Sequence, residues 1–511
     1  MPTDSLPDEP NFEQLRKQAK DLQRVVRAGD PDALAEFAER VPDAAFDRTD
    51  PGSFRLSAAQ LVVARRYGFA SWARLKRHVE LIERYSRFPS RVPAGEPDDP
   101  ATRFLQTACL SYEDDGPVRW AEARELLADH AEIVAGNVYV ASVVGDVAAL
   151  GRVLEVDEAA ASREGGPYRW EPLVYLAYAR HDPAIARDAV LAAARLLVAA
   201  GADPNAGYLW HGLPTPFTVL TGVFGEGEQG PVLQPRHPHS LELGRLLLEA
   251  GADPNDGQAL YNRMFEPDND HLELLFEFGL GAGAGGPWRR RLGPVLESPA
   301  RLVRGQLNWA ITHGMTDRVR LLVDHGADLA TPNDDGSIPA AMAATTGHPE
   351  LVEYLVERGA ARPALSPDDA FVAAALAADA AAVERLRLEH PELADRVRIA
   401  RPGLVPWAAS TGRSRAVEIL VEAGFDVNAK GRTDVPGNQP WQTALHKAAE
   451  DGNVELARTL LRLGADPDIL DRRFDSTPLG WARYFGHEEL IDLLEPVTTP
   501  DATGGEGVDG A

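Results

Sequence analysis

Pairs of leucine or valine residues recur just before a glycine at five places along the chain. The segments are LLVAAGADPN (196–205), LLLEAGADPN (246–255), LLVDHGADLA (321–330), ILVEAGFDVN (419–428) and LLRLGADPD (460–468). The apolar residues at i, i+1 and i+4 cover one face of a helix, and the glycine ends that helix because it adopts the left-handed conformation without a Cβ clash. Pro204 and Pro254 cannot continue a helix, so an extended turn follows. The pattern predicts a repeated helix followed by a protruding finger.

These helix ends follow one another at a regular interval. The step is 33 residues from Gly326 to Gly359, 65 from Gly359 to Gly424 and 40 from Gly424 to Gly464. Two-helix units of about 33 residues stack into solenoids, and longer steps indicate insertions. Less regular helix pairs occur at 123–134, 140–161 and 373–394. We therefore predict an all-α solenoid of stacked helix-turn-helix units over residues 101–496, degenerate over 101–165 and clearer over 166–496.

The residues on either side of the array have a different character. Residues 1–92 contain four helical patterns without the repeated phrase, which predicts a separate helical module. Within it, Asp30 and Ser71 are expected to cap helices, and Ser57 with Gln60 fits a capping box. PAGEPDDP (93–100) is rich in proline and aspartate and predicts a linker. The last residues, 497–511, lack apolar content and are expected to be disordered.

Three segments show the first helix of a unit most clearly. They are GSIPAAMAATTGHPELVEYLVERGA (336–360), QTALHKAAEDGNVELARTLLRLGADPD (442–468) and STPLGWARYFGHEELIDLLEP (476–496). These segments resemble the ankyrin consensus Gly-x-Thr-Pro-Leu-His-x-Ala-Ala. With FEQLRKQAKDLQRVVRAGDPDALAEF and AQLVVARRYGFASWARLKRHVE near the N-terminus, the chain resembles a bacterial family of ankyrin-repeat proteins that begin with a short helical module.

The resemblance carries expectations for function and for three histidines. It implies a solenoid, protein–protein recognition and no catalytic residues. His446 occupies the consensus histidine of a first helix, where the imidazole is expected to bond to the backbone of the adjacent finger. His348 and His487 stand at the start of second helices and are expected to be structural as well.

Charge limits the kind of partner. The chain has 52 lysine and arginine residues against 78 aspartate and glutamate residues, a formal net charge of −26. A surface of that sign repels nucleic acid and anionic lipid. We therefore expect a protein partner with a neutral-to-basic surface, no membrane contact and a monomeric chain. Cys109 is the only cysteine and is expected to be a core thiol; with no signal peptide and no long apolar run, a cytoplasmic location is expected.

The sequence offers little for catalysis. GxSxG, Walker-type, HExxH and paired-cysteine motifs are all missing, and the glycine-rich segment 281–286 has neither a preceding strand nor a following lysine. His211, His237 and His239, with Glu226 and Glu228 nearby, are the one conceivable metal cluster, but their spacing is a weak signal. We therefore expect no enzyme activity, no cofactor and no metal.

Binding is expected at positions that the repeats do not need for stacking, such as finger tips and insertions. Aromatic and arginine side chains are the usual anchors of protein interfaces. The insertion 222–239 is too long for a plain turn, so it either covers an edge of the array or contributes to a groove. Tyr261 and Trp441 could alternatively pack between adjacent fingers. The candidate partner-binding residues are Tyr208, Trp210, His211, Tyr261, Asn262, Arg263, Arg432, Asn438, Gln439 and Trp441.

One segment of the N-terminal module favours a second hypothesis. Residues 57–85 have the shape of a helix-turn-helix, with Arg74, Lys76 and Arg77 after the turn. The match is imperfect because Arg74 stands where the motif expects an apolar residue. Residues 1–92 contain 16 basic and 14 acidic residues, a balance well short of that of a DNA-binding domain. A DNA-tethered regulator is therefore the alternative to a protein-binding scaffold.

Overall fold

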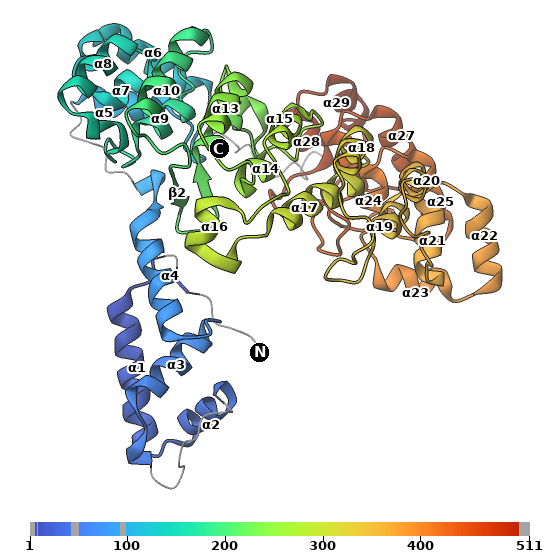
Figure 1. Cartoon of the computed structure of the whole chain (residues 1–511). Helices are drawn as coiled ribbons and strands as arrows, with labels where there is room; N and C mark the ends of the chain where they lie inside the picture. The colour runs from blue at the N-terminus through green and yellow to red at the C-terminus, as the bar shows by residue number, and fades with distance from the viewer. Residues whose placement is uncertain (1–5, 8, 42–50, 92–98, 500–511) are drawn as a thin grey trace. The chain divides into compact units, whose positions relative to one another are not determined.

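The computed structural model describes residues 6–7, 9–41, 51–91 and 99–499, and these residues are mostly helical (Figure 1). The chain divides into two compact units, residues 1–302 and residues 303–511. The first unit holds the N-terminal module and the earlier repeats, and the second holds the later repeats. The structure is the predicted all-α solenoid, with one small sheet in the first unit. Among the described residues, no helix is long and apolar enough to cross a bilayer.

Four helices form the N-terminal module: α1 (Phe12–Arg27), α2 (Pro31–Arg40), α3 (Leu56–Arg66) and α4 (Trp72–Tyr85). Leu15 of α1, Val62 of α3 and Val79 of α4 lie in its shared apolar core. Asp30 and Ser71 cap α2 and α4 as predicted, since each accepts a hydrogen bond from a backbone amide. The capping box at Ser57 is wrong, because α3 already begins at Leu56.

The first unit continues with stacked helix pairs. The first helices α5, α7, α9, α11 and α14 pack against one another in succession, and the second helices α8, α10, α13 and α15 do the same. The bounds are α5 (Pro100–Ala108), α6 (Pro117–Asp129), α7 (Val138–Val143), α8 (Val147–Val156), α9 (Pro172–Tyr178), α10 (Arg187–Ala199), α11 (Val219–Phe224), α12 (Gly230–Leu233), α13 (Ser240–Glu249), α14 (Gly257–Asn262), α15 (Asp270–Glu277) and α16 (Gly286–Leu292).

A three-stranded sheet joins the N-terminal module to a finger of the first unit. Its strands are β1 (Ser86–Arg87), β2 (Gly207–Trp210) and β3 (Pro216–Thr218), in the order β1-β2-β3. Strands β2 and β3 form an antiparallel finger, and β1 pairs with β2 in parallel. The module is thus held against the array by backbone hydrogen bonds, and Ile82 of α4 packs with Leu209 and Trp288 beside them.

The second unit contains the helices α17 (Pro299–Thr312), in which the division between the units falls, α18 (Thr316–Asp324), α19 (Pro339–Thr346), α20 (Pro349–Glu357), α21 (Pro367–Leu376), α22 (Ala380–Glu389), α23 (Leu393–Ala400), α24 (Leu404–Ser410), α25 (Ser414–Glu422), α26 (Ala444–Glu450), α27 (Val454–Arg462), α28 (Pro478–Tyr484) and α29 (Glu488–Leu494). Helices α24, α26 and α28 stack as first helices, and α25, α27 and α29 as second helices. Ala448 and Ala449 are fully buried, and their small side chains allow neighbouring helices to approach closely.

Short 3-10 helices of the first unit lie at Pro51–Ser53, Pro89–Arg91, Ala131–Val134, Glu158–Ser162 and Gly293–Val295.

The predicted helix stops are confirmed. Each has a positive φ, which favours glycine because it lacks a Cβ. The angles are +93° at Gly201, +101° at Gly251, +82° at Gly326, +100° at Gly359, +94° at Gly424 and +92° at Gly464.

The structure differs from two predicted boundaries, those of the linker (93–100) and of the C-terminal tail (497–511). Residues 93–98 of the predicted linker and 500–511 of the predicted tail lie outside the described residues. Asp99, however, caps α5, and Pro100 is the first residue of that helix. At the other end the Thr499 amide donates to Asp468 at 2.7 Å. Asp99, Pro100 and Thr499 therefore belong to the folded array.

Candidate functional site

A cavity of about 680 Å³ opens among the fingers of the first unit. Its walls come from the β2–β3 finger, the insertion after α11, the start of α14 and the segment around α16. The volume lies within the range of roughly 300–1,000 Å³ that is typical of ligand pockets. The aromatic lining residues are Tyr112, Trp210, Phe217, Tyr261 and Trp288, and the charged ones are Glu228, Asp253, Asp256, Arg289 and Glu297.

The aromatic side chains are fixed in place by hydrogen bonds and stacking. The indole of Trp210 stacks on Phe217 at 5.9 Å between ring centroids, and its Nε1 donates to the Ser111 carbonyl at 3.2 Å. The indole Nε1 of Trp288 donates to the Asn205 carbonyl at 3.0 Å. Tyr261 remains 39% exposed, and its hydroxyl donates to Glu228. The cavity thus has a preformed aromatic wall with one ring open to solvent.

Arg180 holds the insertion that forms one wall. This guanidinium is buried and donates to the Pro235 carbonyl at 2.7 Å and to the Gly222 carbonyl at 2.5 Å, at the two ends of the insertion. Gln234 lies between these points, and both Gln234 and Glu228 line the cavity. The insertion therefore contributes to a groove, which is one of the two roles expected for it.

An ionic network fastens the same insertion to α14 and the loop after it. Arg263 is fully buried and forms ion pairs with Glu226 of the insertion, with Asp268 at 2.5 Å and with Asp270 at 3.2 Å. Arg236 of the insertion contacts Asp270 at 2.5 Å. Buried charges are tolerated when they are paired in this way. The network explains why the insertion keeps a defined position.

Residues of the fingers and of α11 fix the positions of two acidic side chains in the cavity. Asp256 caps α14 through the Ala259 amide at 2.9 Å, and the hydroxyls of Thr218 and Thr221 also donate to its carboxylate. Burial raises the pKa of Asp256 to about 6, because desolvation disfavours the charged form. Asp253 accepts from the Asn255 amide at 3.2 Å and lies so close to Gly286 that a Cβ there would collide with its carboxylate.

Several predicted residues meet at this cavity, whereas others do not. Trp210, Tyr261 and Asn262 line it. The exposure expected for Tyr208 and Arg263 is wrong: Tyr208 is 1% exposed because it stacks on Trp170 at 5.0 Å, and Arg263 is 0% exposed in the network above.

Asn262 and His211 have internal partners as well. The buried Asn262 amide donates to the Tyr112 hydroxyl at 2.8 Å, so this residue acts as part of the wall. His211 bonds to Glu113 and packs edge-on against Phe88 at 5.4 Å between ring centroids.

The remaining predicted contacts belong to a long finger of the second unit. Asn438 and Gln439 are exposed near its tip, and Asn438 donates to the Ala400 carbonyl at 2.8 Å. The guanidiniums of Arg432 and Arg473 lie over the Trp441 ring at 5.6 Å and 5.2 Å. Arg473 comes from the next finger, so Trp441 packs between adjacent fingers, as the alternative interpretation expected.

The structural interpretation of the histidines is confirmed. His446 Nε2 bonds to the Ser476 carbonyl at 3.0 Å in the next finger. His348 Nε2 bonds to the Thr312 carbonyl at 3.0 Å, and His487 Nε2 to the Glu450 carbonyl at 3.1 Å. These imidazoles therefore link neighbouring repeats.

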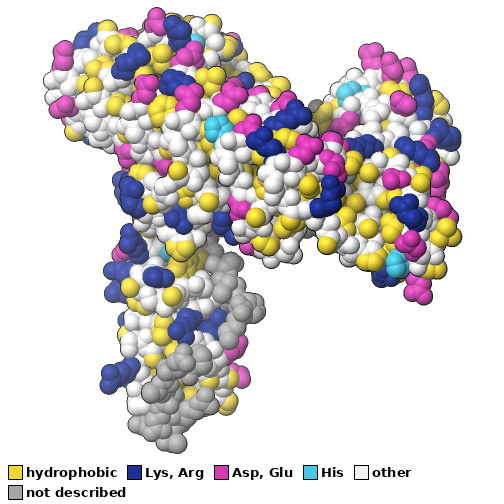
Figure 2. Space-filling view, turned by 45° about the vertical axis from the view of Figure 1, so that its right-hand side comes forward, with side chains coloured by type: hydrophobic (Ala, Val, Ile, Leu, Met, Phe, Trp, Pro, Cys, Tyr) yellow, Lys and Arg dark blue, Asp and Glu magenta, His cyan; other side chains and the backbone are white. Residues whose placement is uncertain are grey.

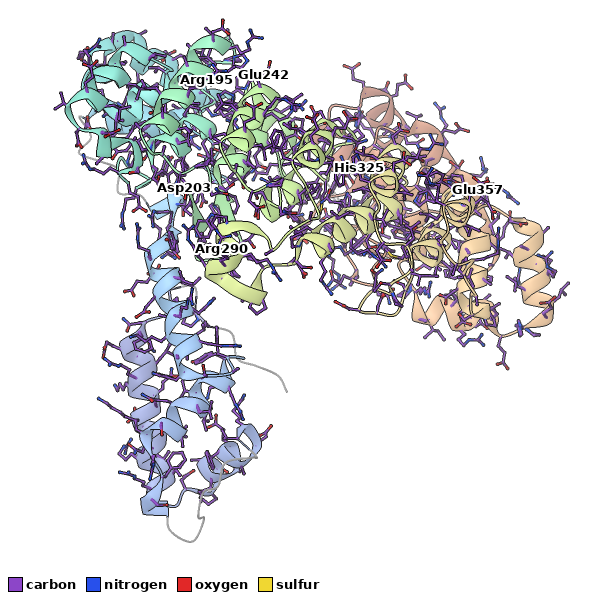
Figure 3. The ribbon with its side chains drawn as sticks, in the orientation of Figure 1. Arg195, Asp203, Glu242, Arg290, His325 and Glu357 are labelled. Carbon is purple, nitrogen blue, oxygen red and sulfur yellow. The ribbon has the colours of Figure 1, made fainter. Side chains whose placement is uncertain are left out.

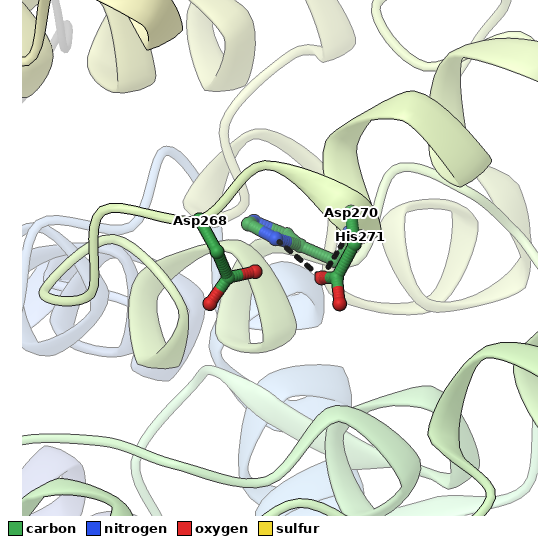
Figure 4. Close-up of side chains that lie close together, drawn as sticks. All are labelled: Asp268, Asp270 and His271. Carbon is green, nitrogen blue, oxygen red and sulfur yellow. Dashed lines mark hydrogen bonds and ion pairs between the residues drawn. The ribbon is translucent and has the colours of Figure 1, made fainter.

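Candidate metal ligands have other contacts. Asp268, Asp270 and His271 lie close together (Figure 4), but the two carboxylates bind the arginines of the ionic network. A guanidinium there supplies the positive charge that a metal would bring. His237 is buried, and its Nδ1 accepts from the His239 amide at 3.1 Å. Burial lowers the pKa of His237 well below its ordinary value.

The basic residues of the DNA-binding alternative lie on α4. Arg74, Lys76 and Arg77 are exposed, and Figure 2 shows lysine and arginine side chains along one side of the N-terminal module. Lys76 pairs with Glu80 at 3.3 Å, which reduces the charge available to a phosphate. Leu75 is buried in the module core. Binding of DNA by this segment stays a prediction.

Sequence reasoning missed a large part of the cavity. Trp288 lies two residues after the glycine-rich segment 281–286, whose composition predicts only a loop, and Tyr112 lies in a degenerate repeat. The only sequence signal for Trp288 was a lone tryptophan beside flexible residues. Asp256 follows a finger motif, where an aspartate is common as a helix cap.

Stacked two-helix units with protruding fingers are an architecture of repeat proteins, and family models match part of this chain. Residues 307–356 match the family model "Ankyrin repeats (many copies)", and residues 371–471 and 406–501 match "Ankyrin repeats (3 copies)". These matched segments, which make up less than half of the chain, resemble ankyrin repeats.

Three relatives show how far the similarity extends. The chain is 30% identical over 200 residues to the ankyrin repeat protein nuc-2 of Neurospora crassa, covering 38% of this chain and 18% of that protein. It is 29% identical over 188 residues to the L-asparaginase of Dirofilaria immitis, covering 36% and 30%. It is also 29% identical over 177 residues to the ankyrin repeat and KH domain-containing protein mask-1 of Caenorhabditis elegans, covering 34% and 6%. The chain spans less than a third of each relative, and all three come from eukaryotes, so the expected bacterial origin is not supported by them.

Proposed function

We propose that the chain is a non-catalytic scaffold that binds a protein partner through its concave face and finger loops, with the cavity of the first unit as the main contact. The cavity carries this proposal, because it combines a preformed aromatic wall with the partly exposed Tyr261. Aromatic side chains at such positions supply much of the binding energy of protein interfaces. Ankyrin repeats also favour protein recognition over catalysis.

The partner surface is proposed to be neutral to basic, in line with the net charge of −26. The long finger of the second unit, with Asn438 and Gln439 at its tip, is proposed as a further contact. The cytoplasmic location and the monomeric state stay predictions.

Recovery of partners by tagged, full-length protein tests the proposal. Tyr261→Ala removes the exposed ring of the cavity and is expected to lower recovery about tenfold, the effect of losing an interface anchor worth more than 1 kcal/mol. Tyr484→Ala is the matched control, because Tyr484 is 71% exposed on α28, outside the cavity. Gln439→Ala, at the exposed tip of the long finger, tests that contact in the same way.

Each variant is first checked by circular dichroism for an unchanged helical signal. Equal recovery of the same proteins by the wild type, Tyr261→Ala and Gln439→Ala would count against binding through these fingers.

A further inference from the structure

We propose that the cavity of the first unit accepts a lysine or arginine side chain from an extended segment of the partner. This inference rests on the proposed function and names the chemistry that the cavity selects. It is carried by three carboxylates without a basic partner and by the aromatic wall that faces the same space.

The cavity has more negative charge than its own basic group can balance. Glu228, Asp253, Asp256 and Glu297 line it, against Arg289 alone. Arg289 donates to the carbonyls of Ala284 at 3.2 Å and Leu296 at 3.4 Å, within its own loop. Glu297 pairs with Arg301 at 2.7 Å. A cation that enters the cavity would therefore meet uncompensated charge from the other three carboxylates.

Those three carboxylates have only neutral hydrogen-bond donors. Glu228 accepts from the Tyr261 hydroxyl, Asp253 from Asn255, and Asp256 from two threonine hydroxyls and one amide. Among the described residues, no lysine or arginine forms an ion pair with any of them. A carboxylate has about four acceptor sites, so Glu228 and Asp253, each with donors from only one residue, can accept a further donor.

The aromatic wall suits the same ligand. A guanidinium or ammonium within about 6 Å of an aromatic ring is attracted by the ring quadrupole, by about 0.5–2 kcal/mol. Trp210, Tyr261 and Trp288 line the cavity together with the carboxylates. The aliphatic part of a lysine or arginine side chain can pack on such rings while its charged end reaches an acid.

A small metal ion fits the cavity less well than an extended cation. Metal ligands must converge on a point, and in the described part of the chain the one group of three within 4.8 Å is Asp268, Asp270 and His271. The three cavity carboxylates do not converge in that way. They are spread over the insertion and a finger, a distribution suited to a basic segment several residues long.

A phage-displayed library of random heptapeptides, panned against the immobilised full-length chain, tests the proposal. Peptides that bind the wild type but not Tyr261→Ala are expected to contain lysine or arginine. Their affinities are then measured by fluorescence anisotropy, with each basic residue also replaced by norleucine. We expect the norleucine peptides to bind at least tenfold more weakly.

Isosteric variants assign the charge to the cavity. Glu228→Gln keeps an acceptor for the Tyr261 hydroxyl and removes the charge, and Asp253→Asn does the same on the finger. Each is expected to weaken binding about fivefold, because a partly exposed charge pair contributes about 1 kcal/mol. Glu242→Gln is the matched control, since Glu242 is exposed on α13, on the side of the array away from Asp203 and the fingers (Figure 3). It should leave affinity unchanged.

The outcomes separate this inference from the proposed function. Tyr261-dependent peptides without basic residues, or affinities unchanged in both isosteric variants, would overturn the inference and leave the scaffold intact. The absence of any Tyr261-dependent peptide would overturn both. Displacement of the peptides by equimolar spermidine would assign the cavity to a free polyamine and overturn the choice of a peptide.

Discussion

Arg263 carries a positive charge at a position with no solvent exposure, and its stability there depends on the acids around it. Glu226, which is 5% exposed, bonds directly to this guanidinium, and Asp268 and Asp270 complete the network. Removing one partner of a buried ion pair leaves the other charge without compensation, which destabilises a protein by about 3–5 kcal/mol. Arg263 therefore stabilises the wall of the cavity and does not form part of its contact surface.

Arg263→Met is expected to lower the free energy of unfolding of the first unit by about 3–5 kcal/mol in urea titrations followed by tryptophan fluorescence. Arg245→Ala is the control, because the ion pair of Arg245 with Glu277 is about half exposed and such pairs contribute about 0–1 kcal/mol. Equal unfolding midpoints for the two variants would contradict the structural role of the network.

His446 is buried in its neutral form. Its Nε2–H donates to the Ser476 carbonyl, and its Nδ1 accepts from the Thr443 amide at 3.3 Å, so a second proton would break a hydrogen bond. Desolvation lowers the pKa of His446 to about 4, with Asp471 raising it and Lys430 lowering it by smaller amounts. The unfolded chain, with an ordinary pKa near 6.5, binds the proton more readily.

The stability contribution of His446 is therefore fully present above pH 6.5 and is lost as the pH falls from 6.5 to 4. We expect the wild type to lose about 2–3 kcal/mol through this group between pH 7 and pH 4.5. His446→Gln lowers stability at pH 7 but lacks this acid-dependent loss. Urea unfolding of both proteins at the two pH values measures the difference, and parallel losses would rule out the assignment.

Residue type alone separated contact residues from support residues only in part. Trp210 and Tyr261, which follow two different finger motifs, are predicted as contact residues, and the structure brings both to the cavity. Tyr208 differs from Trp210 by two positions and points to the same face of β2, yet it is buried by Trp170. That contact joins residues far apart in the sequence, and no local pattern indicates it.

At the scale of elements, the insertion after α11 depends on Arg180. This side chain donates to four backbone carbonyls, those of Ala177, Ala179, Gly222 and Pro235. The insertion has little helix of its own, apart from the short α12, so side-chain bonds must satisfy part of its backbone. Its order is therefore expected to fail locally when the guanidinium is removed.

Arg180→Met keeps most of the side-chain volume and removes these donors. We expect faster tryptic cleavage at Arg236, by about tenfold, because a segment that loses bonds of about 1 kcal/mol each opens more often. Peptide mapping of timed digests measures the rate. Cleavage in the second unit at Arg358, which is exposed and followed by Gly359, provides the internal control, and an unchanged rate at Arg236 would show that other contacts hold the insertion.

Regular elements were predictable where their signals are local. The glycine stops and the caps at Asp30 and Ser71 depend on residues within one turn of the helix end, and the structure has them as expected. The sheet was not predictable, because β1 is two residues long and pairs with a finger more than a hundred residues later. Non-local pairing of so short a strand leaves no periodic pattern in the sequence.

At the scale of the whole molecule, charge acts over distances longer than any single contact. The net charge of −26 creates a field that attracts cations before they reach the cavity. Salt shortens the range of that field, from about 30 Å at 0.01 M to about 10 Å at 0.1 M ionic strength. The association rate of a basic peptide should therefore depend on salt more strongly than its dissociation rate.

Stopped-flow anisotropy with a cavity-binding basic peptide is expected to show the association rate constant falling about tenfold between about 20 mM and 300 mM NaCl. Glu228→Gln removes one charge out of a large excess, so the slope against salt should persist while dissociation becomes faster. The field comes from the whole molecule, whereas the contact is made in the cavity. The salt dependence of the association rate and the dissociation rate should therefore change independently. An association rate that is independent of salt in the wild type would mean that local contacts alone select the basic partner.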